Sequence, residues 1–257
     1  FGSSCFVSCI ITDTCSVHRD MASSTEVRAL IFDCDGTLVD TETSYREAYS
    51  RVVRELRGEE PSSEPVLSVE EWGRNCSGKG LERCAQYAVE ALGLQERSVT
   101  SNVFLTKWKA EFQELIAEPG SILMHEGFDE LYSFARSKSL FIAVASSSDA
   151  AGLRLKLSNG VISHSKVVTN LEGFDAILSN DEVTRHKPDP EIYLLAASRL
   201  GVKPEECWVV EDSPTGVTAG KNAGMRVAAV PNVYTRVNDF SNADVIVESM
   251  SQVIDHL

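Results

Sequence analysis

The stretch RALIFDCDGT, residues 28–37, decides the fold of this chain. Its apolar part, Ala29–Asp33, ends in an acidic residue and runs into a glycine-containing loop, which is typical of a buried strand that feeds an active-site loop. Five further apolar runs share this look: LFIAVA (140–145), AILS (176–179), CWVV (207–210), RVAAV (226–230) and ADVIV (243–247). Strands that alternate with helical patterns predict an α/β fold with a doubly wound parallel sheet.

Two of the intervening helices carry start and stop signals. Each has a candidate N-cap residue, a proline in the first turn and a glycine at its end. In chain order these sets are Asp189, Pro190 and Gly201, and then Ser213, Pro214 and Gly224.

Residues 42–118 break the alternation. Apolar residues recur there at helical spacing in three stretches, each followed by a glycine or a proline-glycine pair: 45–56, 81–92 and 104–116. We therefore expect an all-α helical-bundle cap, inserted after the first strand of a core made of residues 26–41 and 119–257. Such a cap can enclose a site, and a purely structural insert is the alternative.

Residues 1–25 differ from the rest, because they are rich in Ser, Thr and Cys. They are either the remnant of an organelle transit peptide or sequence upstream of a start at Met21, and we expect them to lie outside the fold as a disordered or targeting segment. The seven cysteines of the chain form no CxxC pair and show no zinc-like spacing. We expect reduced thiols and an intracellular protein, in the plastid or the cytoplasm.

The net charge of −14 argues against nucleic acids and anionic lipid surfaces as partners. No run approaches the roughly 18 apolar residues of a membrane span, and we expect a monomer. An acidic protein also repels a phosphorylated metabolite, so a phosphate site in this chain requires local positive charge or a metal ion.

Polar residues follow several of the expected strands. Asp33, Asp35 and Thr37 follow the first strand, Ser146–Ser148 follow the second, and Glu211-Asp212 follow the fourth. Lys187 lies in a loop, RHKPDP, before a helix. Ligands of a parallel sheet bind beyond the carboxyl ends of its strands, so we expect these groups to converge at one edge.

Crowded carboxylates repel one another, and a divalent cation removes that conflict. All-oxygen ligation with few protein groups suits Mg²⁺. One carboxylate can then attack phosphorus, and Asp35 can protonate the leaving oxygen and later activate water. A serine hydroxyl and Lys187 can hold the phosphoryl oxygens. Each signal alone has an ordinary structural explanation, but the ordered set at strand ends does not.

The segments FDCDGT, ASSS, KPDP with Lys187, and VVEDS resemble the four motifs of the haloacid-dehalogenase superfamily, over residues 28–230. The resemblance implies a Rossmann-like core with a helical cap and a Mg²⁺-dependent phosphatase. It implies that Asp33 is the nucleophile, that Asp35 is the acid/base, and that phosphate is bound by Ser146, Ser147 and Lys187. It also implies Mg²⁺ ligation by Asp33, the backbone carbonyl of Asp35, Asp212 and, in support, Glu211.

The segments KPDPEIYLLAASRLGV and VVEDSPTGVTAGKNAGM are similar to the beta-phosphoglucomutase and CbbY-like branch. This similarity implies a small sugar phosphate or bisphosphate as substrate, including the xylulose-1,5-bisphosphate type. The substrate-selecting cap residues that match the branch pattern are Thr41, Glu42, Arg46, Gly78 and Lys79. Tyr45 stands where the CbbY-like pattern has histidine.

Two alternatives to hydrolysis stay open. Thr37 in the first motif is commoner in the phosphatases of this branch than in its phosphomutases, which favours hydrolysis. A non-catalytic phosphometabolite-binding protein could have lost Asp33 or Asp35, and this chain keeps both.

Residues 73–79, GRNCSGK, nearly form a nucleotide-binding P-loop. Gly80 replaces the Ser or Thr that such a loop requires, and no buried strand precedes the segment. We interpret Gly78-Lys79 as a cap loop that contacts the distal phosphate of the substrate, with a solvated turn as the alternative.

Overall fold

The computed structural model describes Phe1 and residues 26–257, so the expectation for residues 1–25 lies outside the described part apart from Phe1. Six strands form one parallel sheet in the order β3-β2-β1-β4-β5-β6. Their bounds are β1 Ala29–Phe32, β2 Phe141–Ala145, β3 Ala176–Leu178, β4 Cys207–Glu211, β5 Arg226–Ala229 and β6 Val245–Ile246. Each strand lies within or next to its predicted apolar run, and β6 is the most shortened.

Helices cover both faces of this sheet. Leu30 and Phe32 of β1 belong to one hydrophobic cluster, and the alternating residues Ala29 and Ile31 belong to another. The first face is covered by α5 (Phe128–Ser137), α6 (Ala150–Lys156) and the 3₁₀ helix η6 (Met250–His256). The second is covered by α7 (Glu191–Leu200) and α8 (Pro214–Asn222). The predicted doubly wound α/β core is confirmed.

The predicted helix signals hold with one correction. Ser213 caps α8 by accepting a hydrogen bond from the Gly216 N–H, and Pro214 is the first helical residue, as predicted. Pro190, however, takes the N-cap position of α7 in place of Asp189. The Asp189 carboxylate instead accepts a hydrogen bond from the Glu191 N–H, so it still satisfies a donor in the first turn.

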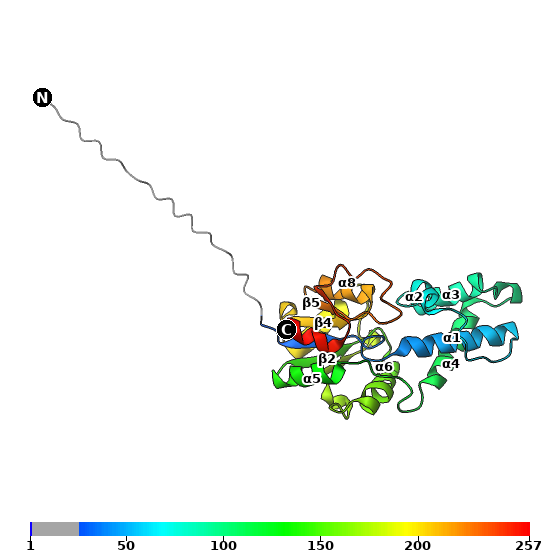
Figure 1. The fold of residues 1–257 in the computed structure, drawn as a ribbon, viewed down its shortest axis with the longest axis horizontal. Coiled ribbons are helices and arrows are strands. Elements are labelled where there is room, and N and C mark those ends of the chain that lie inside the picture. The colour runs from blue at the N-terminus through cyan, green and yellow to red at the C-terminus, as the bar shows by residue number, and fades with distance from the viewer. Residues whose placement is uncertain (2–25) are drawn as a thin grey trace.

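Four helices form a cap between β1 and β2 (Figure 1). They are α1 (Thr41–Arg57), α2 (Val69–Asn75), α3 (Leu81–Ala91) and α4 (Ser101–Leu115). The pattern of apolar residues predicts three of these and misses α2, which begins at a capping box between Ser68 and Glu71. Edge-to-face contacts among Tyr49, Trp72 and Trp108 fill the cap interior.

Two paired linkers join the cap to the core. The Asp40 N–H donates to the Leu123 carbonyl, and the His125 N–H donates to the Leu38 carbonyl. Val39 and Met124 form an antiparallel bridge between them. The chain therefore enters and leaves the cap side by side, which leaves the cap free to lie over one edge of the sheet.

No helix in the described part of the chain is long and apolar enough to cross a membrane. The division at residues 41/42 and 118/119, the monomeric state and the cellular compartment remain predictions.

We expect Gly216→Ala to lower the free energy of unfolding by roughly 1–3 kcal/mol, because overpacking of a close contact has costs of this size. A Cβ at this position would lie 1.6 Å from Glu211 Oε1. Gly152→Ala is the matched control, since Gly152 occupies the same position in α6 and an added Cβ would come no closer than 3.2 Å to Asp149 Oδ1. Urea unfolding measures both, and an equal loss at both positions would contradict the expectation.

Candidate active site

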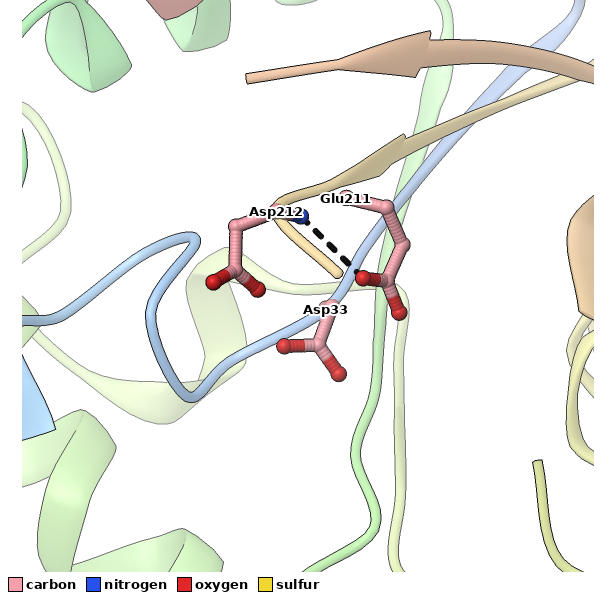
Figure 2. A group of neighbouring side chains, drawn as sticks. All are labelled: Asp33, Glu211 and Asp212. Atoms are coloured by element: carbon pink, nitrogen blue, oxygen red, sulfur yellow. Dashed lines mark hydrogen bonds between the residues drawn. The ribbon is translucent and has the colours of Figure 1, made fainter. Parts of the chain in front are cut away.

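Three carboxylates gather where β1 and β4 end (Figure 2). Asp33 follows β1, Glu211 is the last residue of β4, and Asp212 comes next. The two strands are neighbours in register, with Phe32 opposite Val210, so their ends lie together. The three side chains are buried, and one oxygen of each lies within 4.8 Å of the others. The predicted convergence of Asp33, Glu211 and Asp212 is thus present.

Lys187 contacts two of these carboxylates. Its Nζ donates to Asp33 Oδ1 at 2.6 Å, to Glu211 Oε1 at 2.8 Å and to the Ala145 carbonyl at 3.1 Å. Burial opposes its charge, yet Asp33 and Glu211 raise the pKa of Lys187 well above its usual value. The lysine therefore stays protonated and supplies positive charge beside the candidate nucleophile.

Asp212 receives only neutral donors from its hydrogen-bonding partners. Thr37 Oγ1 donates to its Oδ1 at 3.2 Å, and Asn232 Nδ2 donates to its Oδ2 at 2.8 Å. Burial, followed by the charges of Glu211 and Asp33, raises the pKa of Asp212 well above its usual value. Burial also raises the pKa of Asp33 to about 7, against the opposing effect of Lys187. If all three carboxylates were ionised, the group would carry more negative charge than Lys187 neutralises, which is why these pKa values are raised.

This donor set fits a divalent cation. Carboxylate oxygens are the ligands that Mg²⁺ prefers, and a cation would relieve the repulsion that raises these pKa values. Asp33, Glu211 and Asp212 are the residues whose side chains could hold it.

The Asp35 side chain lies outside the carboxylate group. Its Oδ1 accepts from Thr41 Oγ1 at 2.9 Å and from Lys156 Nζ at 2.5 Å. Its Oδ2 accepts from Ser148 Oγ at 2.8 Å and from Ser146 Oγ at 3.2 Å. Burial alone would raise the pKa of Asp35, but Lys156 and the hydroxyl donors lower it below the usual value. Metal ligation by the backbone carbonyl of Asp35 stays a prediction.

The two serines predicted to bind phosphate differ in their surroundings. Ser146 is buried and donates to Asp35, while its Oγ accepts from the Ser148 N–H at 3.0 Å. Ser147 is exposed at the end of β2. Phosphate contacts by either serine stay predictions, and Ser146 would have to release Asp35 to donate to a phosphoryl oxygen.

Of the predicted cap residues, Glu42 and Arg46 are already engaged within the cap. Glu42 accepts from Trp72 Nε1 at 2.5 Å and from Ser77 Oγ at 2.9 Å, and burial raises its pKa. Arg46 donates through Nε and Nη2 to the Leu67 carbonyl, at 2.9 and 2.6 Å.

The cap loop that carries Gly78 and Lys79 reaches the core. A Cβ added at Gly78 would lie 4.0 Å from Ser213 Cβ, directly after the carboxylates of β4. Lys79 is exposed on the same loop. Contacts of Glu42, Arg46, Gly78 and Lys79 with a substrate remain predictions.

Comparison with known proteins identifies the family. Residues 27–224 match the sequence model of the haloacid dehalogenase-like hydrolases. The chain belongs to the haloacid dehalogenase-like hydrolase family. It is 34% identical to protein CbbY of Rhodobacter capsulatus, over 85% of this chain and 92% of that protein. It is 32% identical to the phosphorylated carbohydrates phosphatase of Thermotoga maritima, over 87% of this chain and 91% of that protein.

A solved structure also resembles most of the chain. A mutant of CbbY from Rhodobacter sphaeroides in complex with xylulose-(1,5)bisphosphate superimposes with a TM-score of 0.66 at 27% identity, over 88% of this chain and 96% of that one. The relatives place the chain among the phosphatases of the haloacid dehalogenase-like hydrolases, as predicted.

Two residues at this haloacid dehalogenase-like site were missed from sequence. Asn232 lies three residues beyond β5, so the rule of inspecting each strand end would have found it. Lys156 lies in a helix, between Leu153 and Leu157 at buried positions, and outside the four motifs. The signal that could have found Lys156 is a lysine on the apolar face of a helix, because lysine is almost never fully buried unless it is paired.

Without divalent cations, we expect the stability of this family member to fall as pH rises from 6 to 8. Asp33 titrates at about 7 in the native state and near 4 when unfolded. Between about pH 4 and pH 7 the native state therefore holds a proton that the unfolded chain lacks, so stability falls over that range and levels off above pH 7. One proton gives a slope of at most about 1.4 kcal/mol per pH unit.

Urea unfolding of wild type and Asp33→Asn at each pH measures the contribution. The difference between them isolates Asp33 from His125, whose pKa burial lowers and whose effect has the opposite sign. Saturating Mg²⁺ should flatten the wild-type profile. A difference that does not change between pH 6 and 8 would contradict the raised pKa.

Proposed function

We propose that this protein is a Mg²⁺-dependent phosphatase that hydrolyses a small sugar phosphate or sugar bisphosphate through an aspartyl-phosphate on Asp33. The observation that carries the proposal is the buried group of Asp33, Glu211 and Asp212, with Lys187 donating to the first two. A carboxylate can serve as a nucleophile toward a phosphate anion only where positive charge surrounds both.

Asp33, Glu211 and Asp212 would hold Mg²⁺, with the backbone carbonyl of Asp35 as a further ligand. When bound, the ion offsets the repulsion between the attacking carboxylate and the phosphoryl oxygens. Lys187 Nζ already contacts Asp33 Oδ1, so it lies where it can contribute to the same end.

In the first step, a carboxylate oxygen of Asp33 bonds to phosphorus, the bond from phosphorus to the sugar oxygen breaks, and Asp35 gives a proton to that oxygen. Because the pKa of Asp35 is lowered here, Asp35 must gain that proton before the step, which the approach of an anionic phosphate favours. In the second step, water attacks the phosphorus of the aspartyl-phosphate, Asp35 takes a proton from that water, and the bond between phosphorus and the Asp33 oxygen breaks, which releases phosphate and frees Asp33. Ser146, Ser147 and Lys187 hold the phosphoryl oxygens. This requires Ser146 to exchange its hydrogen bond with Asp35 for one with phosphate.

The substrate class is supported by the relatives and by the cap. One relative is named for phosphorylated carbohydrates, and one solved relative holds xylulose-(1,5)bisphosphate. Glu42 offers a half-buried carboxylate that can accept from a sugar hydroxyl, and Lys79 offers an exposed ammonium for a distal phosphate. Arg46 would have to release the Leu67 carbonyl before it could contribute.

We expect phosphate release to require Mg²⁺ and to be fastest with pentulose or hexose phosphates and bisphosphates. A screen that includes nucleotides, with Mg²⁺ or with EDTA, measures it. Asp33→Asn should lower turnover by at least about 10³-fold, because the nucleophile is lost. Asp255→Asn, which removes the same charge from an exposed position, should not change it.

Unchanged turnover in a folded Asp33→Asn variant would contradict the mechanism. A preference for nucleotides would contradict the sugar assignment alone. Bisphosphate-dependent isomerisation without steady phosphate release would show a phosphomutase. Binding of the sugar phosphate without any release would show a non-catalytic binding protein.

A further inference from the structure

Lys156 is a buried cation that the proposed steps leave unused. It is the last residue of α6, and only 3% of it is exposed. Its Nζ donates to Asp35 Oδ1 at 2.5 Å and to Ser148 Oγ at 2.8 Å. A buried ammonium requires a partner, and the carboxylate of Asp35 is the anion that Lys156 contacts.

The other surroundings of Lys156 come from the cap. Its Nζ lies 5.5 Å from the ring centroid of Tyr45 in α1 and 5.6 Å from that of Phe112 in α4. The two rings stack on each other, with centroids 3.7 Å apart and planes 2° from parallel. Nζ is almost equally far from the two stacked centroids, so it lies beside the rim of the pair, which helps to keep water away from the ammonium.

Lys156 therefore connects Asp35 to the body of the cap. The other donors to the Asp35 carboxylate are hydroxyls of Ser146 and Ser148, in the core, and Thr41, at the first residue of α1. Lys156 contacts both the Tyr45–Phe112 pair and the carboxylate.

We propose that Lys156 is a positioning residue, which holds the Asp35 carboxylate in place when the Tyr45–Phe112 pair of the cap lies over it. The inference rests on the acid/base role proposed for Asp35. Lys156 acts through that carboxylate and not on the phosphoryl group, whereas Lys187 contacts Asp33. Tyr45 contributes an uncharged ring here, whereas a histidine could bring a second cation against Lys156.

The first test is Lys156→Met, which removes the ammonium and keeps a chain of similar length. We expect kcat for a sugar phosphate to fall about 10- to 100-fold, because a misplaced catalytic group has effects of this size, while KM changes by less than about threefold. Lys156→Arg keeps the charge and should recover part of the loss. Lys156→Gln replaces Lys156→Met if the latter does not fold, as judged by circular dichroism.

The second test asks whether Lys156 works through Asp35. Single-turnover release of the sugar from a sugar phosphate, whose leaving oxygen needs a proton, is measured in wild type, Lys156→Met, Asp35→Asn and the double variant. We expect Lys156→Met to have no further effect once Asp35 is replaced, because a positioning residue has nothing left to position. An equal further loss in the Asp35→Asn background would overturn the inference.

The third test removes the cap contact. Phe112→Leu should lower kcat in the same Asp35-dependent way, though by less than Lys156→Met. Phe104→Leu is the matched control, because Phe104 lies in the same helix but packs against Tyr49 inside the cap. A loss of kcat in Phe104→Leu as large as in Phe112→Leu, at equal thermal stability, would overturn the role of the aromatic pair.

These outcomes separate the inference from the proposed function. The proposed function fails if wild type has no turnover, or if its turnover survives in Asp33→Asn. The inference about Lys156 then fails with it. If wild type does show turnover that Asp33→Asn abolishes and folded Lys156→Met has the wild-type kcat, only the role of Lys156 fails.

Discussion

Uncompensated negative charge at the end of β1 and β4 is the constraint on which the rest of the site depends. Asp33, Glu211 and Asp212 are buried within reach of one another, and Lys187 forms ion pairs with only two of them. Buried like charges destabilise a fold unless a counter-charge is present. The surrounding structure is consistent with this, because Tyr193, Thr37, Asn232 and the N–H groups that follow Glu211 all donate to these oxygens.

A second charged group lies beside the first and differs from it in kind. Asp35 is paired with Lys156 and surrounded by hydroxyls, so its pKa is lowered, whereas burial raises the pKa of Asp33 two residues away. Two carboxylates in one loop thus experience opposite environments. These shifts run opposite to the proposed roles, because a general acid is usually the carboxyl with the raised pKa, so the first step requires Asp35 to gain a proton and Asp33 to lose one.

The strand pattern predicted the sheet and the carboxylates because both follow from local features. A short apolar run that ends in acid marks a strand end, and parallel strands bring their ends to one edge, which places Asp33 beside Asp212. Helix α2 was missed because Val69 and Trp72 are too few apolar residues to show a period. The contacts of Arg46 and Lys156 depend on rotamers and on tertiary packing, which no spacing of residues encodes.

The insertion of the cap between neighbouring strands has a consequence for how the chain reaches its fold. β1 pairs with β2, yet the four helices of the cap separate them in sequence, so this pairing has a high contact order. The cap is made of contacts nearer in sequence and can collapse early into a helical unit. The linkers of the cap, paired at Val39 and Met124, would then bring β1 and β2 together. Assembly of the cap would thus assist the slow pairing of these two strands.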